Sequence, residues 1–400
     1  MMADPEIRSP WAIPADWPAP EPEARAISER LVEVLCARMR EAGGSLAFAD
    51  YMHTVLYEPG LGYYSAGACK FGEAGDFITA PELSPLFSQC VAESCAAVLE
   101  SVPQGAVLEL GAGSGALAAE VLRSLQTQAR LPARYLILEP GADLRERQRR
   151  RLEQDVPELL DRVTWLDRPP EAFAGMLVAN EVLDALPVEL FHWDGNEVRL
   201  RRVQWEGAGF GWTDAPAAAG LAEQVRHLAG QYAWPPDYHS ERAAWLSGWL
   251  RELAAGLMRG AMLFIDYGYP RGEYYHPQRA TGTLMCHYRH RAHPDPLLLP
   301  GLQDITAHVD FTAVAEAADV AGLRVAGFTD QAHYLIDAGI EERMAAAAGA
   351  DPVEGIRLAQ QVRQLMLPGE MGARFKAMLL TRDLEVAVPG FRQQDMRGRL

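Results

Sequence analysis

The stretch VANEVLDALPVE, residues 178–189, ends a run of apolar residues with side chains that could do chemistry. Asn180 can both donate and accept hydrogen bonds, while Glu181 and Asp184 can bind a cationic or amine-bearing molecule. If the following segment were helical, Glu181 and Asp184 would lie three residues apart on one face. Asp184 could instead cap a helix, so its role stays open. We take Asn180, Glu181 and Asp184 as candidate catalytic residues.

A glycine-rich segment upstream, VLELGAGSGAL at residues 107–117, predicts a strand, a tight turn and the start of a helix. Glycines let a ligand approach the backbone, and a helix N-terminus offers free N–H donors. Gly111, Gly113 and Ala116 fit the dinucleotide pattern G-x-G-x-x-A, which is weak evidence alone. Gly115 extends the run to G-x-G-x-G, a denser loop than a dinucleotide needs.

Acidic residues at strand ends favour one ligand class over the other. A pyrophosphate beside Glu109 would be repelled by roughly 1 kcal/mol or more at a protein-like dielectric. S-adenosylmethionine instead carries an ammonium and a sulfonium, which a carboxylate attracts. Glu139 ends the second strand, where it could bind ribose hydroxyls, and Asp167 ends the third, where it could meet an adenine amino group. Any one of them could be a turn or cap residue, but together they predict an S-adenosylmethionine site.

The elements that must position these residues alternate between short apolar runs and helical stretches from residue 105 onward. This alternation predicts a parallel sheet wrapped by helices. Residues 197–214 alternate like an antiparallel hairpin, and the sheet resumes at residues 260–268. Apolar residues at helical spacing predict helices over residues 28–42, 85–99 and 242–258.

These patterns divide the chain into six expected parts. They are a flexible proline-rich arm (1–24), a helical and loop extension over the cofactor site (25–104), the first half of the core (105–195), an inserted hairpin with helices (196–258), the second half of the core with substrate-side loops (259–385), and a tail (386–400).

Composition excludes several classes of protein. The 400 residues have a formal net charge of −17 with no compensating basic stripe, so we expect no nucleic-acid partner. The basic run at residues 145–151 is typical of a solvated helix face. No signal peptide, transit peptide or apolar run of membrane-spanning length is expected, which favours a cytoplasmic protein without a membrane partner.

We also expect no metal site. The five cysteines are scattered and form no C-x-x-C pair, which favours a reducing compartment and argues against a structural zinc site. CHYRHRAH at residues 286–293 and the set Asp304, His308 and Asp310 contain potential ligands, but neither has a recognised metal-binding spacing.

Beyond these local patterns, the chain resembles the MidA family of S-adenosylmethionine-dependent methyltransferases over roughly residues 30 to 335. The resemblance rests on six motifs in the same order: GDFITAPELSPLF (75–87), LELGAGSGAL (108–117), NEVLDALPVE (180–189), FIDYGY (264–269), GTLMCHYRH (282–290) and GLQDITAHVDF (301–311).

The resemblance implies an α/β fold with a Rossmann-like seven-strand class I methyltransferase core, an N-terminal helical extension and an inserted α+β subdomain. It implies that Gly75, Asp76 and Phe77 cover the cofactor, and that Gly111, Gly113, Gly115 and Glu139 bind it. Asp266 and Tyr267, at the end of the fifth strand, could face the substrate or simply end the strand. Further substrate-side residues implied by the motifs are Tyr288, His290, Gln303, Asp304, His308 and Asp310.

The eukaryotic members of the family are mitochondrial and resemble protein arginine methyltransferases needed for assembly of respiratory complex I. Because the acid-rich N-terminus here does not resemble a transit peptide, we expect a bacterial cytoplasmic member. The resemblance implies a methyltransferase that acts on a protein side chain, with arginine favoured. Three alternatives stay open: a small-molecule N- or O-methyltransferase, a non-enzymatic assembly protein that retains the cofactor fold, and a nicotinamide dehydrogenase. A homodimer is also open, because the long apolar helices could bury against a partner or the core.

Overall fold

The chain divides into two compact units, each made of three separated stretches. The structure is a computed structural model that describes residues 7–66 and 78–400. The first unit takes its described residues from Met1–Phe77, Ala185–Trp245 and Arg271–His308, and the second consists of Ile78–Asp184, Leu246–Pro270 and Val309–Leu400. Within the described ranges, no helix has both the length and the apolar character needed to cross a membrane.

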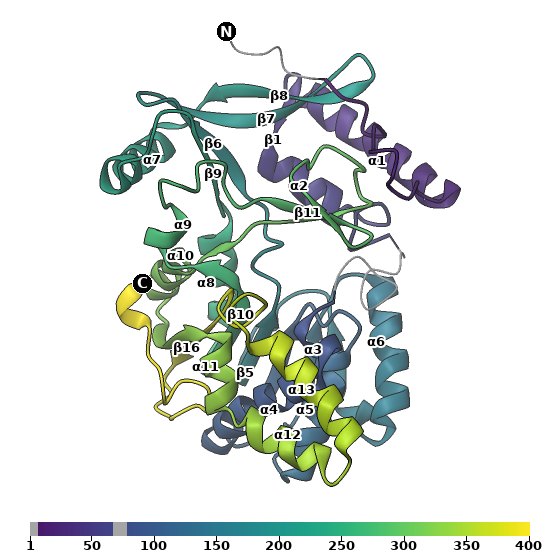
Figure 1. Cartoon of the computed structure of the whole chain (residues 1–400), viewed down its shortest axis with the longest axis vertical. Helices are drawn as coiled ribbons and strands as arrows, with labels where there is room; N and C mark the ends of the chain where they lie inside the picture. The colour runs from purple at the N-terminus through teal and green to yellow at the C-terminus, as the bar shows by residue number, and fades with distance from the viewer. Residues whose placement is uncertain (1–6, 67–77) are drawn as a thin grey trace. The chain divides into compact units, whose positions relative to one another are not determined.

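The second unit is built around a mostly parallel sheet (Figure 1). Only β16 runs antiparallel to its neighbours on this path, and the short strand β14 (Val309–Asp310) pairs with the end of β10. The predicted mixed α/β core with a mostly parallel sheet is therefore confirmed. In spatial order the strands are β15 (Arg324–Asp330), β16 (Phe375–Arg382), β10 (Leu257–Tyr269), β5 (Phe173–Asn180), β2 (Ala106–Leu110), β3 (Tyr135–Leu138) and β4 (Val163–Leu166).

The order of these strands determines where a ligand can bind. The chain moves outward from β2 to β3 and β4, then returns to place β5 on the other side of β2. Ligands of open α/β sheets bind at such a reversal, outside the carboxyl ends of the strands. Leu110 lies opposite Ala179, and Asn180 lies opposite Ile265. The segments that follow β2 and β5 therefore leave the sheet side by side, while β10 continues past Ile265 to Tyr269.

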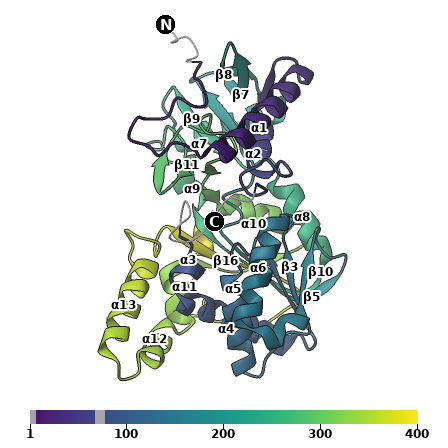
Figure 2. The same cartoon turned by 90° about the vertical axis from the view of Figure 1, so that its right-hand side faces the viewer.

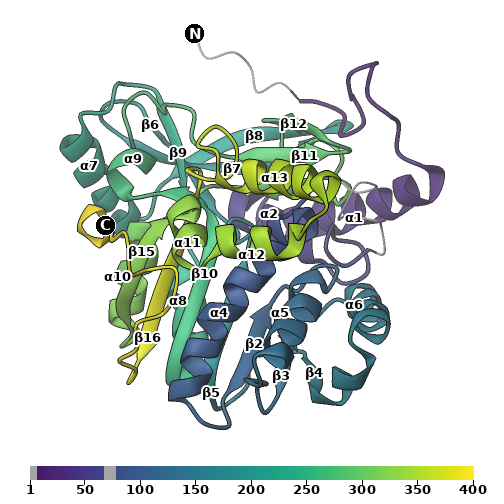
Figure 3. The same ribbon diagram turned by 60° about the horizontal axis from the view of Figure 1, so that its bottom comes forward.

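Both faces of this sheet are covered by helices, which explains why β2 and β5 are apolar along nearly their whole length. Figures 2 and 3 show α4 and α5 against one face, and α8 and α10 pack against each other. The helices are α3 (Ala80–Leu83), α4 (Pro85–Ser101), α5 (Ala116–Thr127), α6 (Ala142–Asp155), α8 (Leu246–Gly256), α10 (Phe311–Val320), α11 (Gln331–Asp337), α12 (Ile340–Ala348) and α13 (Pro352–Met366), with 3-10 turns η1 (Pro157–Arg162) and η2 (Arg397–Arg399).

The first unit contains two antiparallel sheets. One consists of β1 (Ser45–Ala47), β6 (Glu189–Trp193), β7 (Val198–Glu206), β8 (Gly209–Pro216) and β9 (Tyr238–Arg242), and the other of β11 (Met285–Tyr288), β12 (Arg291–His293) and β13 (Asp304–Thr306). β7 and β8 form the predicted hairpin, with Glu206 opposite Gly209. The helices are α1 (Pro22–Glu41), α2 (Phe48–Tyr57), α7 (Ala219–Tyr232) and α9 (Arg271–Tyr274).

The described part of the N-terminal segment contacts the first unit through a strand pairing and aromatic rings. Arg8 pairs with Phe210 of β8, and the Trp17 ring lies 4.8 Å from the His293 ring and 6.2 Å from the Tyr288 ring, centroid to centroid. Its prolines exclude a helix but leave the tryptophans free to pack. β6 belongs to the first unit and α8 to the second.

Candidate functional site

The glycine loop between β2 and α5 has three positions whose backbone conformation favours glycine. Gly111, Gly113 and Gly115 have φ values of +60°, +53° and +86°, in the left-handed region that L side chains disfavour. A Cβ at Gly111 would lie 3.3 Å from Val182 Cγ2, and one at Gly115 would lie 3.3 Å from Gln148 Cα. The loop therefore presents backbone rather than side chains at the end of β2, as a close-fitting ligand requires.

Gln148 of α6 is fully buried and holds this loop in place. Its Nε2 donates to the carbonyl oxygen of Gly113 at 3.1 Å and to Glu139 Oε2 at 3.3 Å. Its Oε1 accepts a hydrogen bond from Trp165 Nε1 at 2.9 Å. The sequence analysis missed Gln148, although a signal was present: it stands four residues after Leu144 and four before Leu152, where an amide interrupts an apolar stripe.

Glu139 and Asp167, the acids after β3 and β4, have different surroundings. Glu139 is 5% exposed, and its Oε1 accepts a hydrogen bond from the Gly141 N–H at 2.8 Å. The Asp167 side chain is 84% exposed and pairs with Arg145 at 2.5 Å. Glu139 is thus fixed in position beside the glycine loop, whereas Asp167 can exchange its partner with little cost.

Glu109 lies inside the sheet rather than on an open surface. It is 2% exposed and accepts a hydrogen bond from the Tyr135 hydroxyl at 2.7 Å. Burial raises the pKa of Glu109 to about 7, and the Tyr135 hydrogen bond opposes the shift. The sequence argument assumed a permanent charge at this position, but the site makes the charge depend on pH near neutrality.

The end of β5 combines an unusual backbone with an unsatisfied acceptor. Glu181 has a φ of +55°, although its N–H still donates to the Ile265 carbonyl oxygen at 2.9 Å. Asn180 Nδ2 donates to Glu181 Oε1 at 3.0 Å. Asn180 Oδ1 is buried and has no hydrogen-bond partner within the described part of the chain. A buried acceptor of this kind favours a ligand that brings a donor.

Asp266 of β10, the residue after the partner of Asn180, fixes the segment after β5. Its Oδ2 accepts hydrogen bonds from the backbone N–H groups of Val182, Leu183 and Asp184 at 3.1, 2.9 and 3.2 Å. The segment is consequently an irregular turn and not a helix, so Glu181 and Asp184 do not share a helix face. Burial, with Asp184 and Glu181 nearby, raises the pKa of Asp266 well above its usual range.

Asp184 is buried and tied to the same strand end. The Tyr267 hydroxyl donates a hydrogen bond to Asp184 Oδ2. Glu181, Asp184 and Asp266 thus bring three carboxyl groups to the ends of β5 and β10, next to the glycine loop after β2. Such a cluster favours a cation, and the planar guanidinium group suits carboxylates through paired hydrogen bonds.

The other predicted substrate-side residues are spread over both units. Asp310 belongs to the second unit, where its carboxylate caps α10 by accepting from the N–H groups of Thr312 and Ala313. In the first unit, Asp304 is buried and accepts from the Tyr64 hydroxyl at 2.8 Å. The Tyr288 hydroxyl donates a hydrogen bond to the Pro18 carbonyl oxygen, and the His308 backbone N–H donates to the Thr283 hydroxyl oxygen. Gln303 is buried and His290 is exposed.

Gly75, Asp76 and Phe77 lie outside the described residues, so their predicted place over the cofactor stays a prediction.

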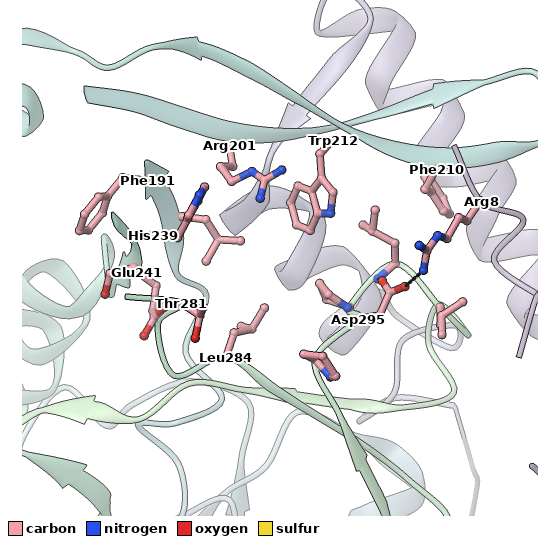
Figure 4. Close-up of a pocket in the computed structure, with 16 residues that line it drawn as sticks. Arg8, Phe191, Arg201, Phe210, Trp212, His239, Glu241, Thr281, Leu284 and Asp295 are labelled. Carbon is pink, nitrogen blue, oxygen red and sulfur yellow. Dashed lines mark hydrogen bonds and ion pairs between the residues drawn. The ribbon is translucent and has the colours of Figure 1, made fainter. Parts of the chain in front are cut away.

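The first unit also contains a cavity of about 330 Å³ (Figure 4). Arg201 and Trp212 reach toward it from β7 and β8, and His239 and Glu241 line it from β9. Arg8 and Asp295 pair at 4.0 Å along its wall. Basic, acidic and aromatic groups share the lining, so its composition does not select one ligand class.

Comparison with known proteins gives concordant matches. Residues 90–329 match the profile of a family described as "Putative S-adenosyl-L-methionine-dependent methyltransferase". A solved structure from Burkholderia thailandensis, described as a "likely methyl transferase" bound to S-adenosyl-homocysteine, is 43% identical, covers 96% of this chain and 100% of its own, and superimposes with a TM-score of 0.92.

Two curated relatives are more distant. The Drosophila melanogaster protein arginine methyltransferase NDUFAF7 homolog, mitochondrial, is 28% identical over 404 residues, which cover 91% of this chain and 88% of the relative. The Danio rerio protein arginine methyltransferase NDUFAF7, mitochondrial, is 28% identical over 396 residues, which cover 90% of this chain and 89% of the relative.

Proposed function

Because this chain belongs to the family of putative S-adenosyl-L-methionine-dependent methyltransferases, we propose that its methyl acceptor is a protein side chain, with arginine favoured. The predicted MidA-like family is confirmed, and S-adenosyl-L-methionine is the cofactor. The cofactor supplies an electrophilic methyl group on a sulfonium, so the protein acts mainly by positioning and by balancing charge.

We propose that the glycine loop and Glu139 hold the cofactor. The left-handed backbone at Gly111, Gly113 and Gly115 leaves room for a ligand against the main chain, and the N-terminus of α5 begins directly after it. Glu139 is buried beside the loop, where a carboxylate can accept hydrogen bonds from ribose hydroxyls. Asp167 at the end of β4 is the proposed partner of the adenine amino group.

The observation that carries the acceptor proposal is the cluster of Glu181, Asp184 and Asp266. An arginine side chain stays protonated near neutral pH, so an acidic site can both bind it and orient one nitrogen. Among the three acids, only Glu181 keeps partial exposure, whereas Asp184 and Asp266 are buried and hold the turn. We therefore assign acceptor binding to Glu181 and positioning to the other two.

In this reaction a bond forms between an arginine nitrogen and the methyl carbon while the sulfur–methyl bond breaks, leaving S-adenosyl-homocysteine. The acceptor nitrogen loses one proton, and the Glu181 carboxylate is the proposed group that receives it before releasing it to solvent. Asn180 Oδ1, which has no hydrogen-bond partner among residues 7–66 and 78–400, is the proposed acceptor of a hydrogen bond from the cofactor or the methyl acceptor.

The two relatives named protein arginine methyltransferases support arginine as the acceptor. Their identity of 28% is low enough that the acceptor needs a direct experiment. The acceptor-side roles of Tyr288, His290, Gln303, Asp304 and His308 stay predictions, and the cytoplasmic location belongs to the same proposal as the acceptor.

The test is to incubate the purified protein with methyl-labelled S-adenosyl-L-methionine and a bacterial cell extract. Labelled material is then separated into protein and small molecules, and the protein is hydrolysed to amino acids. We expect the label in protein and, after hydrolysis, in methylated arginine. Label only in small molecules would support a small-molecule methyltransferase, and no transfer despite cofactor binding would support the assembly-protein alternative.

A further inference from the structure

Two histidines face each other across neighbouring strands of the first unit. His192 of β6 lies directly opposite His239 of β9. Their rings are stacked, with centroids 4.2 Å apart and planes inclined by only 5°. Asp237 stands two residues before His239, in the bend that precedes β9, and its carboxylate lies close to both histidine side chains. The sheet therefore brings three potential metal-ligating side chains to one place.

The ligating atoms of these side chains converge. Nε2 of His192 lies 3.0 Å from Asp237 Oδ1, and Nε2 of His239 lies 3.1 Å from the same oxygen. One ligand atom from each residue lies within 4.8 Å of the others. His192 is 8% exposed, and its Nε2 is buried without a geometrically acceptable hydrogen bond among the described residues. This buried imidazole nitrogen lies at ion-pairing distance from the Asp237 carboxylate but makes no hydrogen bond of good geometry among the described residues, so its lone pair is available to a metal ion.

We propose that His192, Asp237 and His239 bind a divalent transition-metal ion of the zinc class. Two imidazoles and one carboxylate suit Zn²⁺ and similar borderline ions rather than Ca²⁺ or Mg²⁺. Tetrahedral zinc with bonds of about 2.0–2.1 Å separates neighbouring ligand atoms by about 3.4 Å. The two nitrogen–oxygen distances are close to that value, so small side-chain movements would complete the site.

The surrounding charges and backbone agree with this site. Asp237 has a φ of +65°, a conformation that costs a non-glycine residue about 1 kcal/mol or more. In this conformation its carboxylate lies toward the histidines. The positive charge of Arg201 lies near His239 and disfavours a bound cation, but Arg201 is itself paired with Asp214 at 3.6 Å. The metal would join β6 to β9, and His239 connects it to the cavity of Figure 4, from which water or another ligand could reach the fourth position.

No local spacing of ligands in the sequence predicts this site. His192 and His239 are 47 positions apart, and only the pairing of β6 with β9 brings them together.

The experiment uses the full-length chain without an affinity tag, stripped of metal with a chelator and titrated with Zn²⁺ by calorimetry. We expect one Zn²⁺ per chain with a Kd of about 1 µM or tighter, and a Tm that rises with added Zn²⁺. Substitution of Asp237→Asn should weaken binding at least roughly tenfold, because a charged ligand is lost. Its side chain is 79% exposed, so the fold should tolerate the change.

His239→Ala tests the imidazole contribution, and His227→Ala, an exposed position on α7, is the matched control. Co²⁺ added to the wild-type chain should give the visible absorption of a four-coordinate site, and this absorption should be lost in Asp237→Asn and kept in His227→Ala. Equal Zn²⁺ affinity in wild type, Asp237→Asn and His239→Ala would overturn the proposal, as would the absence of Zn²⁺ binding to the wild-type chain.

Discussion

The carboxylate of Asp266 accepts a hydrogen bond from the backbone N–H of Leu183 at 2.9 Å, across 83 positions of the chain. The same oxygen accepts from the N–H groups of Val182 and Asp184. One buried side chain at the end of β10 therefore sets the course of the chain after β5. It also places Glu181, the proposed acceptor-binding residue, beside the glycine loop.

Replacing Asp266 with alanine should remove this anchor. Three backbone donors would lose their acceptor, which should lower the free energy of unfolding by about 3 kcal/mol and reduce methyl transfer. Urea denaturation gives the first quantity, and a labelled-methyl assay the second. Asp266→Asn should cost less than alanine, because burial already favours the uncharged acid and an amide oxygen can still accept. A cost for asparagine as large as for alanine would show that the charge, rather than the acceptor, matters.

Gly115→Ala should weaken cofactor binding. Its φ of +86° costs a non-glycine residue about 1–2 kcal/mol, and the new Cβ would press on Gln148 Cα at 3.3 Å. Calorimetric titration with S-adenosyl-homocysteine should show roughly a tenfold or greater loss of affinity. Gly220→Ala on α7 is the matched control, because nothing lies within 4 Å of its added Cβ. Unchanged affinity in Gly115→Ala would contradict the placement of the cofactor on this loop.

Gln148→Leu should keep the packing volume but lose the three contacts of the amide. The Trp165 N–H and the Gly113 carbonyl oxygen would each lose a partner, so the free energy of unfolding should fall by about 1–3 kcal/mol. Cofactor affinity should fall as well, because Glu139 and the loop are no longer held together. Denaturation and calorimetry on the same sample separate the two effects, and a stability loss without an affinity loss would make Gln148 purely structural.

Glu109 should make stability depend on pH. Its pKa of about 7 in the folded state exceeds the ordinary value of 4.5, so between these values the folded chain holds a proton that the unfolded chain has released. The free energy of unfolding should therefore fall as pH rises from 4.5 to 7, by about 3 kcal/mol from this group alone. Glu109→Gln should remove that part of the slope, and chemical denaturation at several pH values measures it. An identical slope in the variant would show that Glu109 is already ionised when folded.

How far the sequence could predict the molecule depended on whether a feature was local. The glycine loop and the β7–β8 hairpin have strong local patterns, and the structure contains both of them. The turn after β5 could not be predicted, because its shape is set by Asp266 from a distant strand. The expectation that Glu181 and Asp184 share one face of a helix is therefore wrong.

The same limit applies to the site residues. Gln148 and Glu109 differ from their expected surroundings because burial and hydrogen-bond partners arise from packing between β2, β3 and α6. The pairing of His192 with His239 likewise depends on strand register. Strand ends could be located from sequence, but the environment of each side chain required the fold.

We propose to test whether Glu181 binds an arginine acceptor by measuring the methylarginine that wild type and Glu181→Gln form at saturating cofactor. The substitution keeps size and hydrogen bonding but removes the carboxylate proposed to bind the guanidinium. We predict at least a roughly hundredfold loss of methylarginine, with S-adenosyl-homocysteine affinity within a few-fold of wild type. If Glu181→Gln forms methylarginine at the wild-type rate, Glu181 does not bind the acceptor. If the wild-type enzyme forms no methylarginine, arginine is not the acceptor.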